Sequence, residues 1–211
     1  SDIKGFLFDC VIINDASTIT YPKLLKPNNI NSFKILNVIK NQGHARCFAL
    51  GIRHITENED FDYLILMDGD GEDRPIEIRR LILKIQEQPN KSFVAKRIKR
   101  SEGIIFKFLY FMHKLITLIF TGKKINFGNY SCLSKKDVLL ISSKASLWSS
   151  YSGTVKKYIH DFGSINSERG KRYFGPSKMS LYRLIIHSFS IIAVFKYQVL
   201  IRSIIMILIL S

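Results

Sequence analysis

Short apolar runs and amphipathic stretches alternate along the first half of the chain. The apolar runs predict strands over residues 6–13, 33–38, 63–67 and 92–95. Apolar positions at helical spacing predict a helix from Asn41 to His54, a second helix that starts at Pro75, and a long apolar helix over residues 104–120. Strands that alternate with helices predict an α/β fold with a mostly parallel sheet flanked by helices.

The C-terminal segment, residues 181–211, is overwhelmingly apolar, but single cations such as Arg183, Lys196 and Arg202 interrupt it. Only nine residues follow Arg202, whereas a membrane-spanning helix needs about 20. One interpretation is a buried core helix. We favour a domain of residues 1–180 followed by juxtamembrane helices, which lie in the membrane interface or begin a truncated span, because spaced cations can reach lipid phosphates.

Charge and cysteine content narrow the function classes. The net charge of +15 and the pI of about 9.8 indicate an anionic partner, such as a phosphorylated ligand or an anionic membrane surface. The basic residues are scattered and form no zinc-finger, RNP or helix-turn-helix motif, so we expect no nucleic acid partner. The three cysteines lie far apart, which predicts reduced thiols in a cytoplasmic setting and no zinc site.

An acidic turn, Asp68 to Asp73, follows the third predicted strand and places four carboxylates in six residues. A calcium loop is excluded because its sixth and twelfth positions would be Asp73 and Arg79. A haloacid-dehalogenase-type phosphatase also carries DxDG, but the later acidic pair that it needs is absent from the sequence. A DxD clamp, in which Mg²⁺ or Mn²⁺ holds a diphosphate, fits best. Asp15 ends the first predicted strand, so both acidic turns are expected in one crevice.

Six segments in order resemble the polyprenol-phosphate (dolichol-phosphate mannosyltransferase-like) sugar transferases of glycosyltransferase family 2. They read VIINDAS, NQGHARCFALGI, LMDGDGEDRPIEI, VAKRIKRSE, INFGNYSCLSKKDV and RYFGPSKMSLYRLI. The resemblance implies a GT-A-like (Rossmann-like) domain, and the family's first strand has no counterpart after Ser1. The chain departs from the family pattern at Asn14, at Glu72 and at Ser131, where an arginine for the acceptor phosphate is common.

The resemblance also implies residue roles. Asp15 would hold the base or ribose of a nucleotide diphosphate sugar, and the other donor residues would be Asn41, Gly43, His44 and Asp68. For Asn41, Gly43 and His44 a plain helix start is the alternative. The metal ligands would be Asp68, Asp70 and Glu72, and the catalytic residues Asp70 and Arg97. The acceptor phosphate would be bound by Arg97, Arg100, Arg172, Ser177 and Lys178. For Arg172, Ser177 and Lys178 the alternative is a basic loop that meets lipid charge non-specifically. Asp73 and Arg74 are interpreted as a capping acid before Pro75 and its solvated neighbour.

These features predict an inverting glycosyltransferase that moves a sugar to a polyprenyl phosphate at the cytoplasmic face of a membrane, with Mg²⁺ or Mn²⁺ as cofactor. A phosphate acceptor needs no general base, and no carboxylate of the second half sits in a catalytic motif. Two alternatives remain open. One is transfer to the hydroxyl of a glycan or lipid-linked sugar, and the other is a catalytically inactive, membrane-bound module that binds nucleotide sugars.

Overall fold

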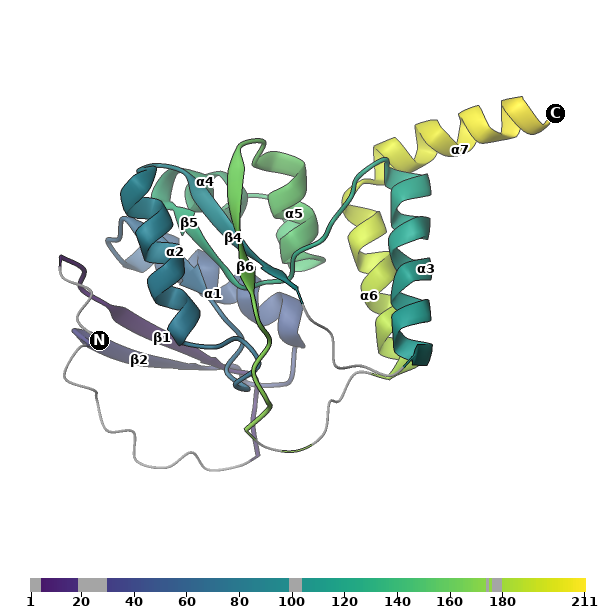
Figure 1. Cartoon of the computed structure of the whole chain (residues 1–211). Coiled ribbons are helices and arrows are strands. Elements are labelled where there is room, and N and C mark those ends of the chain that lie inside the picture. The colour runs from purple at the N-terminus through teal and green to yellow at the C-terminus, as the bar shows by residue number, and fades with distance from the viewer. Residues whose placement is uncertain (1–4, 19–29, 99–103, 174, 176–179) are drawn as a thin grey trace.

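The computed structural model describes residues 5–18, 30–98, 104–173, 175 and 180–211 (Figure 1). The strands are β1 (Asp9–Asn14), β2 (Ser32–Asn37), β3 (Tyr63–Leu66), β4 (Ser92–Arg97), β5 (Ser131–Ser134) and β6 (Phe162–Ser167). The helices are α1 (His44–Asn58), α2 (Ile76–Glu87), α3 (Ile104–Thr121), α4 (Lys135–Ser142), α5 (Tyr151–Tyr158), α6 (Leu181–Val194) and α7 (Lys196–Leu210), with a 3-10 turn η1 at Ala145–Trp148.

The strands form two sheets rather than one. β1 and β2 pair in parallel, with Asp9 opposite Ser32 and Asn14 opposite Asn37. The second sheet has the order β3-β5-β4-β6. In it β5 runs antiparallel to both β3 and β4, whereas β6 pairs with β4 in parallel. The prediction of a mostly parallel sheet is therefore wrong for β5, a strand that the apolar pattern did not reveal.

Two hydrophobic cores cover the faces of the four-stranded sheet. Alternate strand residues point to opposite faces, so Val94 and Leu133 enter one core while Phe93 and Cys132 enter the other. The first core is completed by α1, α4 and α5, and the second by α2. The apolar faces predicted for the two N-terminal helices are buried as expected, through Ala49 and Ile52 on α1 and through Leu81, Ile82 and Ile85 on α2.

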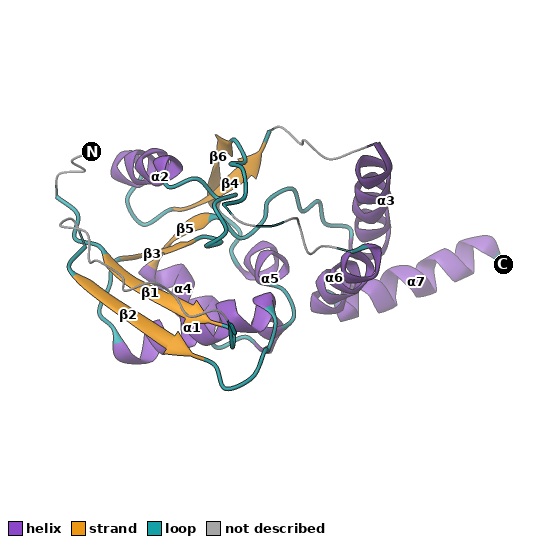
Figure 2. Cartoon of the chain, turned by 90° about the horizontal axis from the view of Figure 1, so that it is seen from below, coloured by secondary structure: helices purple, strands orange, loops and turns teal. Residues whose placement is uncertain are grey.

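Three apolar helices stand to one side of the sheets (Figures 1 and 2). α3 packs against both α6 and α7, and α6 also contacts α5. Within the described residues, no single helix has both the length and the apolar composition needed to cross a membrane. Residues 182–194 and 196–210 meet these requirements only as a pair, and that pair is bent by 90°.

Candidate functional site

The buried side chain of Asp73 stabilises the acidic turn that follows β3. Its side chain is only 3% exposed, and its Oδ2 accepts the backbone N–H of Asp68 at 3.0 Å. The Asp70 carboxylate accepts the N–H of Glu72 at 3.0 Å. α2 is preceded by Pro75 and has no side-chain cap, so the interpretation of Asp73 as a capping acid is wrong. Asp73 instead restrains the backbone at Asp68, where the chain continues from β3 into the turn.

Asp15 and the start of α1 form the second part of the site. The Asp15 carboxylate accepts the backbone N–H groups of Gln42 at 2.6 Å and Gly43 at 2.9 Å, and Asn41 donates to the Asp15 carbonyl at 3.2 Å. Gly43 has a φ of 84°, a left-handed conformation that favours glycine. Burial and the nearby Asp15 carboxylate raise the pKa of the Cys47 thiol to about 11. Asp15 therefore ties the end of β1 to the start of α1.

His44 joins the two acidic turns. Its Nε2 lies 2.7 Å from Oδ1 of Asp68 and 3.3 Å from Nδ2 of Asn129. Desolvation lowers the pKa of His44, but the hydrogen bond and charge of Asp68 outweigh it and raise the pKa above its ordinary value. Burial raises the pKa of Asp68, but the hydrogen bond and charge of His44 outweigh burial and lower that pKa below its ordinary value. The two predicted turns are thus connected through the start of α1, with Asp15, Gly43, His44 and Asp68 in one group.

A basic segment, residues 168–173, lies against the acidic turn. Arg172 contacts the Asp70 carboxylate at 2.9 Å and the Glu72 carboxylate at 3.3 Å, and Arg169 also pairs with Glu72. Two backbone hydrogen bonds fix this position, from Gly170 N–H to the Glu72 carbonyl and from Tyr173 N–H to the Asp70 carbonyl. Two of the three carboxylates predicted to bind a metal, Asp70 and Glu72, therefore contact the chain's own guanidinium groups.

Arg97 ends β4 beside the same turn. Its guanidinium lies 3.4 Å from Oδ1 of Asp73 and beside Gly128, where an added Cβ would be 3.8 Å from it. Burial raises the pKa of Asp73, and Arg97 opposes that rise. Of the other predicted acceptor residues, Arg172 faces the acidic turn, whereas Arg100, Ser177 and Lys178 lie outside the described residues.

Ser131 is fully buried in β5 and cannot stand in for a surface arginine. Its hydroxyl lies 2.5 Å from the Tyr151 hydroxyl and donates to the Asn129 carbonyl at 2.9 Å. Arg74, interpreted as a solvated neighbour, pairs with Glu168 at 3.4 Å, and its carbonyl accepts the Tyr130 hydroxyl at 2.8 Å. Sequence reasoning missed Asn129 and Arg169 at the site; the opposite charges of DGDGED and RGKR were the available signal for Arg169.

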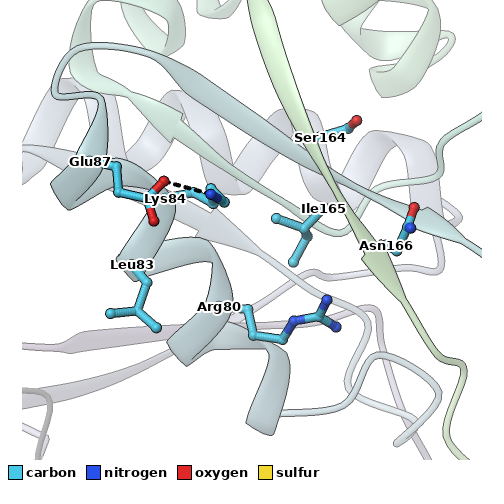
Figure 3. Close-up of a pocket in the computed structure, with 7 residues that line it drawn as sticks. All are labelled: Arg80, Leu83, Lys84, Glu87, Ser164, Ile165 and Asn166. Atoms are coloured by element: carbon cyan, nitrogen blue, oxygen red, sulfur yellow. Dashed lines mark hydrogen bonds and ion pairs between the residues drawn. The ribbon is translucent and has the colours of Figure 1, made fainter.

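Two recesses lie near α2. One, of about 650 Å³, is lined by parts of the acidic turn and of the basic segment: Gly71, Arg74, Pro75, Ile76, Gly170, Lys171, Arg172 and Tyr173. The other, of about 350 Å³, lies between α2 and β6, where Arg80, Lys84 and Ile165 are among the lining residues (Figure 3). None of the predicted site residues lines the second recess, so the first is the one that extends the candidate site.

The donor chemistry suits a hard divalent cation, since carboxylate oxygens are the ligands that Mg²⁺ and Mn²⁺ prefer. Asp68 and Asp70 keep 19% and 28% of their side-chain surface exposed. In the part of the chain that the structure describes, however, no three Asp, Glu, His or Cys side chains are grouped as metal ligands. A cation that binds Asp70 and Glu72 would have to displace Arg172 from both.

Two comparisons with known proteins bear on the family of this chain. A protein of Methanocaldococcus jannaschii, uncharacterized protein MJ0544, is 24% identical over 139 residues, which are 62% of this chain and 60% of that protein. The chain thus spans less than two thirds of that relative's length. The model of glycosyl transferase family 2 matches residues 2–143, more than half of the chain. That family has the GT-A fold, and the α/β arrangement described above is compatible with it. The chain therefore belongs to glycosyl transferase family 2.

Proposed function

We propose that this chain transfers a sugar, with inversion, from a nucleotide diphosphate sugar to a polyprenyl phosphate at a membrane surface. Family membership supports glycosyl transfer in general and implies a nucleotide sugar donor and an acceptor. The phosphate acceptor is the finer part of the proposal. The observation that carries it is the close matching of acidic and basic side chains around the acidic turn.

The charges of the side chains at this turn nearly cancel. The acidic side chains are Asp68, Asp70, Glu72 and Asp73, and the basic ones are Arg97, Arg169, Arg172 and, when protonated, His44. With His44 neutral the formal sum is three positive minus four negative charges, or −1. A diphosphate would make the site strongly negative, so its binding requires an additional cation or a rearrangement of the ion pairs.

An exchange of partners meets this requirement. A divalent cation on Asp68 and Asp70 would supply positive charge to the diphosphate and stabilise it as the leaving group. Arg172 would then lose its ion pair with Asp70, and its guanidinium would be available to bind a phosphate in a bidentate manner. His44 lies 2.7 Å from Asp68 and stands close enough to the same turn to contact the donor. The Asp15 carboxylate retains acceptor capacity for a ribose hydroxyl beyond its two backbone donors.

The proposed acceptor chemistry is supported by the partners of three carboxylates. Among the described residues of the C-terminal half, Asp137 accepts a hydrogen bond from Ser92, Asp161 pairs with Lys91, and Glu168 pairs with Arg74. An acceptor hydroxyl would need a positioned base to remove its proton. A phosphate oxygen is already anionic. It can attack the anomeric carbon while the bond to the diphosphate breaks, and the nucleoside diphosphate leaves with the electron pair.

Arg97 and Arg172 are the described side chains best placed to align that acceptor. Both are partly exposed at the acidic turn, and together they would hold two mutually repelling anions at reacting distance. Arg100, Ser177 and Lys178 complete the proposed acceptor group. We also propose that the C-terminal segment, residues 181–211, keeps the protein at the cytoplasmic face of a membrane, where the lipid acceptor is found.

Donor binding is tested with Asp70→Ala. Calorimetry with UDP and GDP in Mn²⁺ should show metal-dependent binding to the wild type and none to the variant. Unchanged affinity in the variant would contradict the role of Asp70 as a cation ligand. A wild type that binds the nucleotide in Mn²⁺ but transfers no sugar to any acceptor would indicate an inactive binding module.

Acceptor binding is tested with Arg97→Ala and Arg172→Ala, with Arg79→Ala on the exposed side of α2 as the matched control. Both site variants should lower the rate of transfer to polyprenyl phosphate more than they weaken donor binding, while the control stays at the wild-type rate. If the site variants also keep the wild-type rate, the acceptor assignment fails. Faster transfer to a glycan hydroxyl than to the phosphate would favour the alternative acceptor.

A further inference from the structure

The outer face of α3 is an apolar stripe. Phe108, Phe111, Leu115 and Leu118 follow one another at intervals of three and four residues, which places them on one side of a helix. All four are exposed, and the two phenylalanines are 61% and 60% exposed. A continuous exposed patch of this kind marks a surface that binds a protein or a membrane.

The described side chains of α3 that are buried include two threonines. Thr117 and Thr121 are almost fully buried, and the Thr121 hydroxyl donates to the Thr117 carbonyl at 2.6 Å. The His113 ring lies 6.4 Å from the His187 ring of α6, and Nδ1 of His113 is inaccessible to solvent. Oε1 of Gln198, on α7, is also inaccessible. Buried polar atoms therefore accompany buried apolar side chains such as Phe195 among these helices, while the stripe of Phe108, Phe111, Leu115 and Leu118 lies outside.

In water an amphipathic helix turns its apolar face to the core, so a helix that buries threonines and exposes a stripe of phenylalanine and leucine departs from the expected pattern. It matches the rule for helices surrounded by lipid, which gather polar and small side chains between them and expose apolar side chains. α7 follows the same pattern, since Ile201, Ile204, Ile205 and Leu208 are exposed and none of its residues is buried. α7 contacts α3, so exposed apolar side chains lie on both helices of one packed pair.

α3 and α7 are joined where α3 ends. Nε of Arg202 donates to the carbonyl of Ile119 at 2.7 Å, and its guanidinium lies beside Gly122. Exposed lysines flank the joined elements, with Lys123 and Lys124 directly after α3 and Lys196 at the start of α7. Lysines beside an exposed apolar surface complement the negative charge of anionic lipid headgroups.

We propose that α3, α6 and α7 form one docking surface for an anionic lipid bilayer, with the Phe108–Phe111 stripe of α3 at the boundary between headgroups and acyl chains. α3 lies outside the C-terminal segment, residues 181–211, that the proposed function places at the membrane. The docking surface therefore extends the proposed function and rests on the same membrane location. Nucleotide binding does not depend on it, and the two can therefore fail separately.

The first test is flotation of the full chain with vesicles of phosphatidylcholine, alone or mixed with phosphatidylglycerol. Phe108→Glu with Phe111→Glu should lower partitioning about tenfold per residue, because each ring loses its burial in the bilayer. The matched control replaces Leu139 and Leu140, two exposed leucines on α4, with glutamate and should bind as the wild type does. Retained UDP or GDP binding in Mn²⁺ shows that a variant is folded.

The second test places a tryptophan in the stripe. In a Trp148→Phe background, Phe111→Trp should be quenched by lipids with brominated acyl chains, whereas Leu139→Trp should not. Equal vesicle binding by the wild type and the double glutamate variant would overturn the proposal. So would an unquenched Phe111→Trp in vesicle-bound protein, or a lipid-free dimer that the double glutamate variant abolishes, since a second copy would then cover the stripe.

Discussion

Replacement of Asp73 with alanine should unfold the acidic turn at lower temperature and abolish nucleotide binding. Asp73 is the buried carboxylate that accepts the Asp68 N–H at 3.0 Å and faces Arg97 at 3.4 Å. Alanine leaves the Asp68 N–H without an acceptor, which removes the restraint that positions the Asp68 side chain. Asp73→Asn is the matched comparison, because its amide oxygen can still accept that N–H.

The expected size follows from these contacts. An unsatisfied buried N–H costs about 1–3 kcal/mol of unfolding free energy, and the part-exposed pair with Arg97 adds about 1 kcal/mol or less. Burial raises the pKa of Asp73, so removal of its charge returns some of the desolvation free energy. A net loss of about 2 kcal/mol corresponds to a melting temperature about 4–8 °C lower for a chain of this size. For Asp73→Asn we expect a loss of about 1 kcal/mol or less.

Thermal unfolding followed by circular dichroism measures the stability of both variants in the same detergent buffer, and calorimetry measures UDP and GDP binding in Mn²⁺. Equal destabilisation by alanine and asparagine would mean that the charge, and not the accepted hydrogen bond, holds the turn. An Asp73→Ala protein that melts and binds nucleotide like the wild type would refute the role given to Asp73.

Two further variants test the ion pairs and the basic segment. His44→Gln should lower the melting temperature most below about pH 6.5. The pKa of His44 is raised in the folded state, so the stabilisation from the pair with Asp68 is lost as pH rises through that pKa. A difference in melting temperature between wild type and His44→Gln that widens with pH would contradict this. A Cβ on Gly170 would lie 2.3 Å from the carbonyl oxygen of Gly71, so Gly170→Ala should destabilise by about 1–3 kcal/mol. Gly69→Ala, which meets no atom within 4 Å, is the control, and equal melting temperatures would show that the basic segment does not need this close approach.

The sequence predicted elements with a strong apolar pattern and missed those without one. β3 and β4 were visible because YLIL and SFVA are continuous apolar runs, and α2 because Leu81, Ile82 and Ile85 recur at helical spacing. β5 reads SCLS, and two of its four residues are serines that are buried in the sheet. There the Ser131 hydroxyl contacts the hydroxyl of Tyr151, which lies 20 residues further along the chain. A local sequence pattern cannot show such a contact.

The candidate site was predicted unevenly for a similar reason. The motif residues Asp15, His44 and Asp68 were visible in the sequence and lie in one connected group, because each sits at the end of a strand or the start of a helix. The contacts that hold the acidic turn in place were not predicted. Asp73 and Arg169 act through buried or long-range contacts, and Arg169 pairs with a carboxylate 97 residues away.

The basic segment gives a physical link between the two halves of the proposed reaction. Arg172 contacts Asp70, and Ser180, the residue that caps α6 by accepting the Arg183 N–H, follows eight residues later. A chain of that length spans at most about 29 Å, so the guanidinium on the acidic turn is tethered close to a helix of the proposed docking surface. Because a cation on Asp70 competes with Arg172, loading of the donor would free an arginine that the chain already holds near the membrane. On the proposed function, a lipid phosphate then replaces the lost carboxylate partner, so the Arg172 guanidinium is paired with an anion both before and after the donor is loaded.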